Sequence, residues 1–318
     1  MSNNIISGFG IWIWEINSCS GGNCNTIIQN LISTGISWIA IKCGDSGLNA
    51  TQWNKVVSEL IPIAHANGIK VLAWWYGVPS TTAQQLAYLP AVASQCDGLI
   101  ADCEGEWESE SGAEAKAEAF LSSLVEEIGL SYPLYHSPFA VVNYHSGFPY
   151  KAFTKHCISL PQCYTEAWGI EVNQAMSLTD NSWTQFFAAN PGSIEQVYPI
   201  FTTFGKEVEG KLPFTQVDLL AFINHYRGLP ISFYSYDSSN ALWWSTMRQL
   251  HQNSSATPPQ TPPPQPNSNL PFPTLTPQQN EPSTASTVIS EIVKDNPQAA
   301  NSFLDFMKKI ANFVFKRN

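Results

Sequence analysis

The stretch Asp97-Gly98-Leu99-Ile100-Ala101-Asp102-Cys103-Glu104-Gly105-Glu106-Trp107-Glu108 begins as an apolar strand and ends in a cluster of carboxylates. Side chains alternate between the two faces of a strand, so we expect Asp102, Glu104 and Glu106 to point the same way. Carboxylates in a row on one face of a buried strand are costly, because unpaired buried charge is strongly disfavoured. This cost favours a chemical role at the C-terminal end of the strand. Solvated acids in a loop after the strand are the simpler alternative.

Strand-like and helical stretches alternate on both sides of this acidic strand. The other expected strands are 5–14, 37–42, 69–76, 133–137, 159–165, 196–204 and 229–236. The helices expected between and after them are 25–33, 51–67, 81–93, 113–128, 183–189, 215–227 and 240–251. Eight strands alternating with helices over about 250 residues predict an α/β fold, the closed (β/α)8 TIM barrel. A doubly wound open sheet is the rival, but no Gly-rich dinucleotide loop follows the first strand.

The composition changes after this repeating part, which we assign to residues 1–252 as one barrel domain. Residues 253–284 are rich in Pro, Gln and Asn and predict an extended linker that cannot bury a core. Residues 285–318 predict a short amphipathic helical segment, whose apolar residues recur at helical spacing. Self-association, binding to a membrane surface and docking to a protein partner remain open as its role. The apolar residues of that face are Phe303, Met307, Ile310 and Val314.

Charge and composition exclude several classes of partner. The net charge is −10, which disfavours binding to nucleic acid or to an anionic membrane by bulk electrostatics. The 11 Trp and 11 Tyr residues suit a protein that stacks aromatic rings on sugars. Residues 1–4 lack the basic region of a signal peptide, so we expect action outside the cell after lysis or as part of a virion.

The seven cysteines show no zinc-ligand spacing, and we expect neither a metal nor a cofactor. Cys19 and Cys24 flank a short Ser-Gly-Gly-Asn loop and are spaced so that a small disulfide is one interpretation. The other five lie on or beside predicted strands, where a free cysteine behaves as a small apolar core residue. These are Cys43, Cys96, Cys103, Cys157 and Cys163.

Active sites of TIM barrels lie at the C-terminal ends of the strands, and these ends carry acids and aromatic rings. A glycosidase needs such a mouth, because one carboxylic acid protonates the leaving oxygen while a second group stabilises or attacks the sugar cation. The catalytic candidates are Asp102, Glu104 and Glu106. The substrate-binding candidates are Trp14, Glu15, Lys42, Asp45, Trp74, Tyr76, His136, Gln162, Tyr164, Tyr236 and Asp237.

The spacing Asp102-x-Glu104 would place both carboxylates inward on adjacent rungs of the strand. Glu104 then serves as the acid, while Asp102 tunes it or orients an N-acetyl group, as substrate-assisted hydrolysis of N-acetylhexosamines requires. Tyr164 is a candidate for positioning the acetyl group. Lys42 either offsets negative charge in the mouth or forms a structural salt bridge, and both interpretations stay open. His136 ends a strand and is a weaker candidate for substrate contact.

Two families of glycoside hydrolase resemble these residues. Trp38-Ile39-Ala40-Ile41-Lys42, Gly68-Ile69-Lys70-Val71-Leu72-Ala73-Trp74 and Asp102-Cys103-Glu104 are similar to strands two to four of family 25, the lysozyme-type muramidases. That resemblance implies catalysis by Asp102 and Glu104. The stretch 97–104 is also similar to the family 18 chitinase signature, with Ile100 where that signature has an Asp. In the first strand only Glu15 supplies the carboxylate that family 25 has there.

The chain also resembles barrel proteins of phages and bacteria that pair an acidic fourth strand with a Phe-Pro-Tyr loop, here Phe148-Pro149-Tyr150, and a Pro-Gln-x-Tyr strand, here Pro161-Gln162-Cys163-Tyr164. Together these features predict a glycosidase acting on an N-acetylhexosamine polymer, most readily peptidoglycan and otherwise a chitin-like chain. A non-catalytic glycan-binding or structural barrel of a viral particle is the first alternative. A metal-dependent hydrolase that uses Asp102, Glu104 and Glu106 as oxygen ligands is the second.

Overall fold

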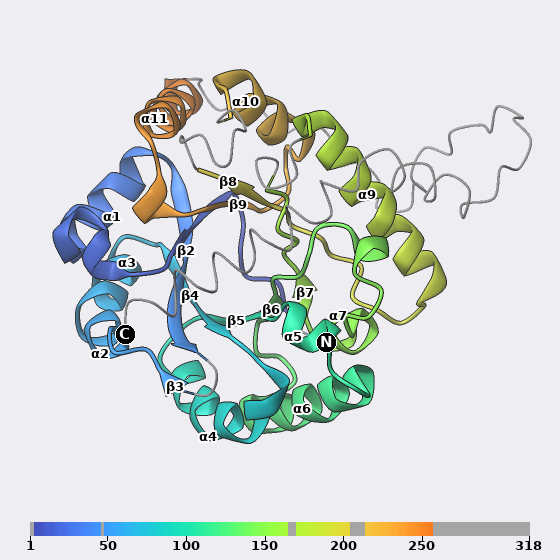
Figure 1. The fold of residues 1–318 in the computed structure, drawn as a ribbon. Helices are drawn as coiled ribbons and strands as arrows, with labels where there is room; N and C mark the ends of the chain where they lie inside the picture. Colours follow the sequence, from blue (N-terminus) through green and yellow to red (C-terminus); the bar gives the residue numbers. More distant parts are fainter. Residues whose placement is uncertain (1–2, 46–47, 165–169, 204–213, 257–318) are drawn as a thin grey trace, which may run out of the picture. The chain divides into compact units, whose positions relative to one another are not determined.

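The computed structural model describes residues 3–45, 48–164, 170–203 and 214–256, and in this part the strands form one sheet. The sheet curves around a central axis, with helices outside it (Figure 1). The strands are β1 (Phe9–Ile13), β2 (Ile36–Asp45), β3 (Leu48–Asn49), β4 (Lys70–Tyr76), β5 (Gly98–Asp102), β6 (Leu134–His136), β7 (Ile158–Ser159), β8 (Ile200–Thr202) and β9 (Ile231–Tyr234).

Parallel pairing of consecutive strands makes the sheet a closed barrel. The strand order is β7-β6-β5-β4-β2-β1-β9-β8, and the short β3 pairs antiparallel with β2. The remaining junction, between β7 and β8, is closed by backbone hydrogen bonds from Ser159 N to Gln196 O at 3.0 Å and from Ile200 N to Pro161 O at 2.9 Å. An open doubly wound sheet has two free edges, so this closure confirms the predicted (β/α)8 TIM barrel.

The barrel interior is filled by large aromatic and aliphatic side chains rather than left as a pore. Trp38 enters the interior across Gly10, where a Cβ atom would lie 2.1 Å from the indole ring. Glycine at position 10 is therefore what leaves room for a buried tryptophan. The cluster of buried residues comprises Ile6, Trp12, Trp38, Ala40, Leu72, Trp74, Ile100, Tyr135, Ile158, Leu160, Tyr198 and Ile200.

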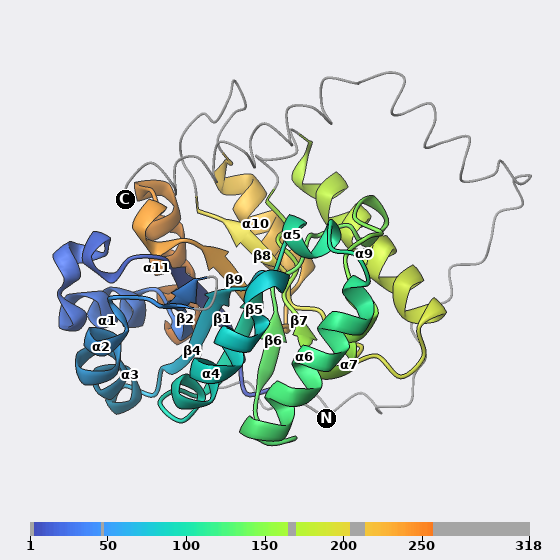
Figure 2. The ribbon, with the colours of Figure 1, turned by 60° about the horizontal axis from the view of Figure 1, so that its bottom comes forward.

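Helices form the outer layer and connect successive strands (Figures 1 and 2). Local signals mark several of their ends: Asn23 caps the first helix by accepting from Thr26 N, and Thr215 with Asp218 forms a capping box. The helices are α1 (Cys24–Ser33), α2 (Trp53–Lys55), α3 (Ile61–Ala66), α4 (Thr82–Ala93), α5 (Gly105–Glu108), α6 (Ala113–Ile128), α7 (Tyr150–His156), α9 (Val172–Ala189), α10 (Gln216–His225) and α11 (Ala241–Ala256). A π-helical turn at Val56–Leu60 joins α2 to α3.

Several predicted boundaries are wrong. Helix α9 begins at Val172 rather than near Trp183, because its polar first half still buries Ala175 and Met176 at helical spacing. The strand expected at 159–165 is shortened to two residues, since Pro161 cannot donate to the ladder. Helix α11 continues to Ala256, into the stretch assigned to the linker. The rest of the linker and the helical segment 285–318 lie outside the described residues.

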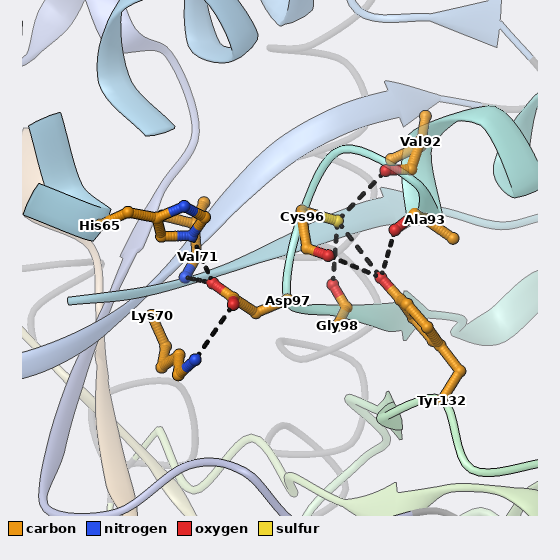
Figure 3. Close-up of polar contacts among 9 residues, drawn as sticks. All are labelled: His65, Lys70, Val71, Val92, Ala93, Cys96, Asp97, Gly98 and Tyr132. Atoms are coloured by element: carbon orange, nitrogen blue, oxygen red, sulfur yellow. Dashed lines mark hydrogen bonds and ion pairs between the residues drawn. The ribbon is translucent and has the colours of Figure 1, made fainter. Parts of the chain in front are cut away.

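Asp97 anchors the N-terminal end of β5, the end opposite the acidic cluster (Figure 3). Its carboxylate accepts a hydrogen bond from Val71 N at 2.8 Å and pairs with His65 at 2.7 Å and Lys70 at 3.2 Å. Beside it, the Tyr132 hydroxyl donates to the carbonyl oxygens of Ala93 at 2.9 Å and Cys96 at 3.2 Å. The first acid of the acidic stretch therefore ties β5 to its neighbours.

All seven cysteines are free thiols, so the disulfide considered between Cys19 and Cys24 is not formed. The Cys19 thiol instead donates to Glu15 O at 3.4 Å, and the Cys24 thiol faces Glu59 Oε2 at 3.7 Å. Of the five cysteines expected in the core, Cys96 is partly exposed and the other four are buried. Among the described helices, none combines the length and apolar character that crossing a membrane requires.

Candidate active site

The mouth of the barrel lies next to the buried core, at positions two residues further along the strands. Because side chains alternate along a strand, the positions two residues beyond core members also face the barrel axis. Core residues Trp12, Ala40, Trp74 and Ile100 are thus followed by side chains that can hydrogen-bond or carry charge. These inward residues at the C-terminal ends of the strands are Trp14, Lys42, Tyr76, Asp102, Ser137, Gln162 and Tyr234.

Two carboxylates converge on one amide donor at this mouth. Gln162 Nε2 lies 3.1 Å from Asp102 Oδ1 and 2.9 Å from Glu104 Oε1. The same nitrogen lies 3.2 Å from Ser137 O and 3.3 Å from Ser137 Oγ. The two carboxylate oxygens therefore cannot be farther apart than the sum of their distances to the shared nitrogen, 6.0 Å. We call Asp102, Glu104 and Gln162 the carboxylate–amide cluster.

Glu104 and Glu106 reach the mouth by a route other than strand alternation. Strand β5 ends at Asp102, Glu104 is the N-cap residue of α5, and Glu106 lies within that helix. The expectation of three acids on successive inward rungs is wrong, because the chain turns after Asp102. Glu104 nevertheless folds back to the donor that Asp102 uses, while Glu106 is exposed and accepts a hydrogen bond from the Tyr76 hydroxyl at 2.8 Å.

The environment of the cluster favours protonated carboxyl groups. Burial raises the pKa of Asp102 well above its usual value, and the charge of Glu104 raises it further, against an opposing effect of Lys42. Burial also raises the pKa of Glu104, while the hydrogen bond from Gln162 lowers it and the charge of Glu106 raises it. Two close carboxyls titrate as a pair, so the cluster retains a proton at a pH where isolated carboxyls have lost theirs.

Lys42 is buried at the mouth but does not pair with Glu104. Its Nζ lies 2.8 Å from Asp45 Oδ2 and stands over the rings of Trp14 at 4.6 Å and Trp74 at 5.2 Å. Both interpretations of Lys42 hold in part, because it forms a salt bridge and its charge also lowers the pKa of Asp102. The carboxylate of Glu104 instead accepts a hydrogen bond from Gln162 Nε2.

Tyr234 and Ser137 are mouth residues that sequence reasoning missed. Burial and the charges of Asp237, Asp102 and Glu104 all raise the pKa of Tyr234, so its hydroxyl stays neutral. Its ring packs at 5.7 Å on the ring of Tyr164. Ser137 donates a hydrogen bond to Asp102. Both could have been found by counting two residues along the strand from the inward-facing Ser232 and Tyr135, because inward-facing positions alternate along a strand.

The structure places three predicted residues away from the mouth. His136 is fully buried on the outward face of β6, where its ring stacks on Phe153 at 5.3 Å and Nε2 bonds Ser159 Oγ at 2.8 Å. Trp74 is 1% exposed, one layer below the mouth, so it supports the floor rather than offering a free ring. Tyr236 follows the end of β9 and bonds Ser20 Oγ at 2.7 Å.

Glu15 and Asp237 lie on the exposed rim. Glu15 accepts a hydrogen bond from Ser18 Oγ at 3.3 Å, and Asp237 accepts one from Ser235 Oγ at 2.7 Å. Burial first, and then the charges of Asp237 and Glu15, raise the pKa of the Cys19 thiol. The rim is therefore negatively charged outside the carboxylate–amide cluster.

The acids do not form a metal site in the described part of the chain. Within residues 3–45, 48–164, 170–203 and 214–256, no three His, Cys, Asp or Glu side chains converge as a metal ion requires. Asp102 and Glu104 share the Gln162 donor, while Glu106 accepts a hydrogen bond from Tyr76, so the three acids do not converge on one point. Their geometry lends no support to the metal-dependent alternative.

Comparisons with known proteins agree on the fold. No protein-family model matches the chain, and no curated protein matches it in sequence. An endo-β-1,4-mannanase from Thermotoga petrophila is similar in structure, with a TM-score of 0.54 and 9% identity over 81% of this chain and 79% of that one. A chitinase-like lectin from tamarind has a TM-score of 0.51 and 12% identity, covering 76% of this chain and 98% of the lectin.

A family 25 glycosyl hydrolase from Bacillus anthracis aligns over 48% of this chain and 69% of its own, with 11% identity and a TM-score of 0.35. The family 25 resemblance stays a prediction. What the structural comparisons establish is that this chain has the barrel architecture on which both polysaccharide hydrolases and a lectin are built.

Proposed function

We propose that the protein is a glycoside hydrolase that cleaves a polymer of N-acetylhexosamine, with peptidoglycan preferred to chitin. The observation that carries this proposal is the carboxylate–amide cluster, in which Asp102 and Glu104 share the Gln162 donor at the catalytic end of a TIM barrel. The raised pKa values of both carboxyls support it, because a general acid must keep its proton near neutral pH.

Glu104 is the general acid in this proposal, and Asp102 is its partner. The shared Gln162 amide holds one oxygen of each carboxyl group within 6.0 Å of the other. The reaction we propose is substrate-assisted: the acetamido oxygen attacks the anomeric carbon as its bond to the leaving oxygen breaks, Glu104 protonates that oxygen, and Asp102 holds the acetamido N–H. Water, deprotonated by Glu104, then adds to the anomeric carbon and opens the cyclic intermediate, which restores the acetamido group and the protonated Glu104.

Side chains around the cluster suit an acetylated sugar. Tyr164 and Tyr234 pack together with ring centroids 5.7 Å apart, and Tyr234 lies at the mouth end of β9. Glu106 and Asp237 remain second-rank carboxylates. The ion pair between Lys42 and Asp45 also favours catalysis over mere binding, because it leaves Glu104 outside any salt bridge with Lys42.

The deciding experiment compares wild type with E104Q on purified peptidoglycan and on chitin oligomers. Loss of turbidity and release of reducing ends are measured, with E127Q as the matched control, since Glu127 is exposed on the outer helix α6. We expect wild type and E127Q to cleave and E104Q to lose at least about a hundredfold in rate. Full activity of E104Q would overturn the assignment of the acid, and activity abolished by a chelator would favour the metal-dependent alternative.

Glycan binding without catalysis is the second candidate, favoured by one observation. The Gln162 amide already occupies one oxygen of each carboxylate, and a lectin with this architecture exists. Under this alternative wild type and E104Q both bind the polymer and neither cleaves it. Action after lysis or within a viral particle, and the roles considered for segment 285–318, remain predictions under either candidate.

A further inference from the structure

A groove of about 380 Å³ lies between helices α1 and α11, beside the end of β9. Both views show the two helices next to each other on the outside of the barrel (Figures 1 and 2). The volume falls within the roughly 300–1,000 Å³ typical of small-molecule sites. It is lined by Ser20, Asn30, Tyr236, Ala241, Trp244 and Arg248, and we call it the flank groove.

One side of the flank groove is a small polar network. The Tyr236 hydroxyl lies 2.7 Å from Ser20 Oγ and accepts from Asn30 Nδ2 at 2.9 Å, and Asn30 also reaches Ser20 Oγ at 3.3 Å. Ser20 has a φ of 48°, the positive-φ conformation that no other non-glycine residue of the described chain adopts. Such a conformation is unfavourable for an L-residue and tends to occur at functional positions. Here it holds a hydroxyl at the groove.

The other side combines an aromatic ring with a cation. Trp244 is half-buried and packs edge-on against Tyr236 at 5.0 Å, while the Arg248 guanidinium lies 5.6 Å from the Trp244 ring centre. The Arg248 side chain is exposed, and Nε reaches Ser33 Oγ at 3.4 Å. An indole face flanked by hydroxyl and amide groups suits a sugar ring, and a planar guanidinium suits a carboxylate.

The flank groove lies just beyond β9, the strand that ends in the mouth residue Tyr234. Asp237 follows Tyr236 in the turn after β9. The groove therefore begins two residues along the chain from the mouth residue Tyr234.

We propose that the flank groove binds a carboxylate-bearing amino sugar, the unit that distinguishes peptidoglycan from neutral chitin. Trp244 stacks on the sugar ring, Asn30 and Ser20 bond its hydroxyl or amide groups, and Arg248 pairs with the carboxylate. The inference rests on the proposed function, because it specifies the class of sugar that the proposed glycoside hydrolase recognises. Its binding test does not require any hydrolysis.

The test uses the full chain carrying E104Q, labelled with ¹⁵N-arginine, and follows the arginine Nε–H resonances. The sequence contains three arginines, Arg227, Arg248 and Arg317, so R248Q assigns the relevant signal and Arg227 is an internal control. Separate titrations use N-acetylmuramic acid, N-acetylglucosamine and acetate. We expect the Arg248 signal to shift and saturate with N-acetylmuramic acid, and to move little with the neutral sugar or with acetate at equal concentration.

Variants then separate recognition of the ring from recognition of the charge. W244A should weaken binding of N-acetylmuramic acid about tenfold or more, and the milder N30A keeps the test valid if W244A does not fold. An Arg248 shift of equal size with acetate, or with N-acetylglucosamine, would overturn the proposal, as would no shift at all.

Hydrolysis provides a second, separate readout. If wild type cleaves both polymers, R248Q should lower the rate on peptidoglycan relative to chitin by about fivefold or more. An unchanged ratio would overturn the role of the groove while leaving the proposed function intact. A chain that cleaves neither polymer would contradict the proposed function, yet the resonance shifts would still decide whether the groove binds this sugar.

Discussion

Gln162 Nε2 donates a 2.9 Å hydrogen bond to Glu104 Oε1, which joins a residue after β7 to the residue that begins α5. This bond stabilises the ionised form of Glu104 and so opposes the effect of burial on its pKa. The amide therefore sets how far the pKa of the proposed acid rises. The pKa of Glu104 therefore depends on the neutral Gln162 donor as well as on burial and on the charge of Glu106.

Replacing Gln162 with Leu should shift the pH dependence of activity. Loss of the donor raises the pKa of Glu104, so the acid stays protonated to higher pH and the alkaline limb of kcat/KM moves upward. We expect a lower maximal rate as well, because Glu104 and Asp102 lose their common anchor. A pH–rate profile on soluble oligomers measures this shift. An alkaline limb that stays in place would show that Glu104 is not the titrating acid.

Tyr234→Phe should reduce kcat by about 10- to 100-fold with a smaller effect on KM. Tyr234 ends β9 at the mouth, and burial together with the charges of Asp237, Asp102 and Glu104 raises its pKa, so its hydroxyl stays neutral. The matched control is Y226F, because the Tyr226 hydroxyl donates to Asp180 on the outer helices, away from the mouth. Steady-state kinetics of the two variants decide the point, and equal losses in both would indicate a general effect on folding.

The buried His136 should make the protein less stable in acid. Burial lowers the pKa of His136 to about 3, whereas an unfolded histidine titrates near 6.5. The unfolded state therefore binds more protons below pH 6.5, so stability falls as the pH decreases from 6.5 towards 3. Between pH 7 and pH 5 this residue alone should cost about 2 kcal/mol in the free energy of unfolding.

Urea unfolding at the two pH values measures that cost in wild type and in H136F. The variant removes the titrating group, so the part of the pH dependence that comes from His136 should disappear. The exposed H225F is the control and should behave as wild type, since His225 lies at the surface next to Asp180. Identical pH dependence in wild type and H136F would contradict the buried neutral state.

Asp97→Asn should destabilise the barrel by about 1–2 kcal/mol without lowering activity. Burial alone would raise the pKa of Asp97, but hydrogen bonds from Val71 N, His65 and Lys70 lower it overall. A lowered pKa in the folded state contributes stability above the unfolded value of about 3.9, and that contribution is lost as the pH falls through the folded value. The difference between wild type and D97N should thus be present at pH 7 and fade in strong acid. Thermal unfolding at both pH values and a rate assay at pH 7 test both parts.

The architecture, and the end of the barrel that carries the acids, could be predicted from the amino-acid sequence alone. Strand and helix periodicities are local properties, and eight alternations close readily only as a barrel, so the closure between β7 and β8 was predictable. The position of Asp102 followed in the same way from the end of an apolar strand. The predicted helix 113–128 coincides with α6, whose Gly129 has the positive φ of a helix stop.

Which side chains meet at the mouth depends on tertiary packing and could not be predicted. A turn after Asp102 brings Glu104 back to Gln162, and no local pattern specifies that return. In the sequence, several strand ends offer an acid that could pair with Lys42. The observed pairing with Asp45 depends on how the mouth packs. One residue of register moved the inward position from His136 to Ser137, because a single step along a strand reverses the face. The flank groove also exists only in the folded protein. Helices α1 and α11 lie at opposite ends of the barrel domain in sequence and become neighbours only when the barrel closes.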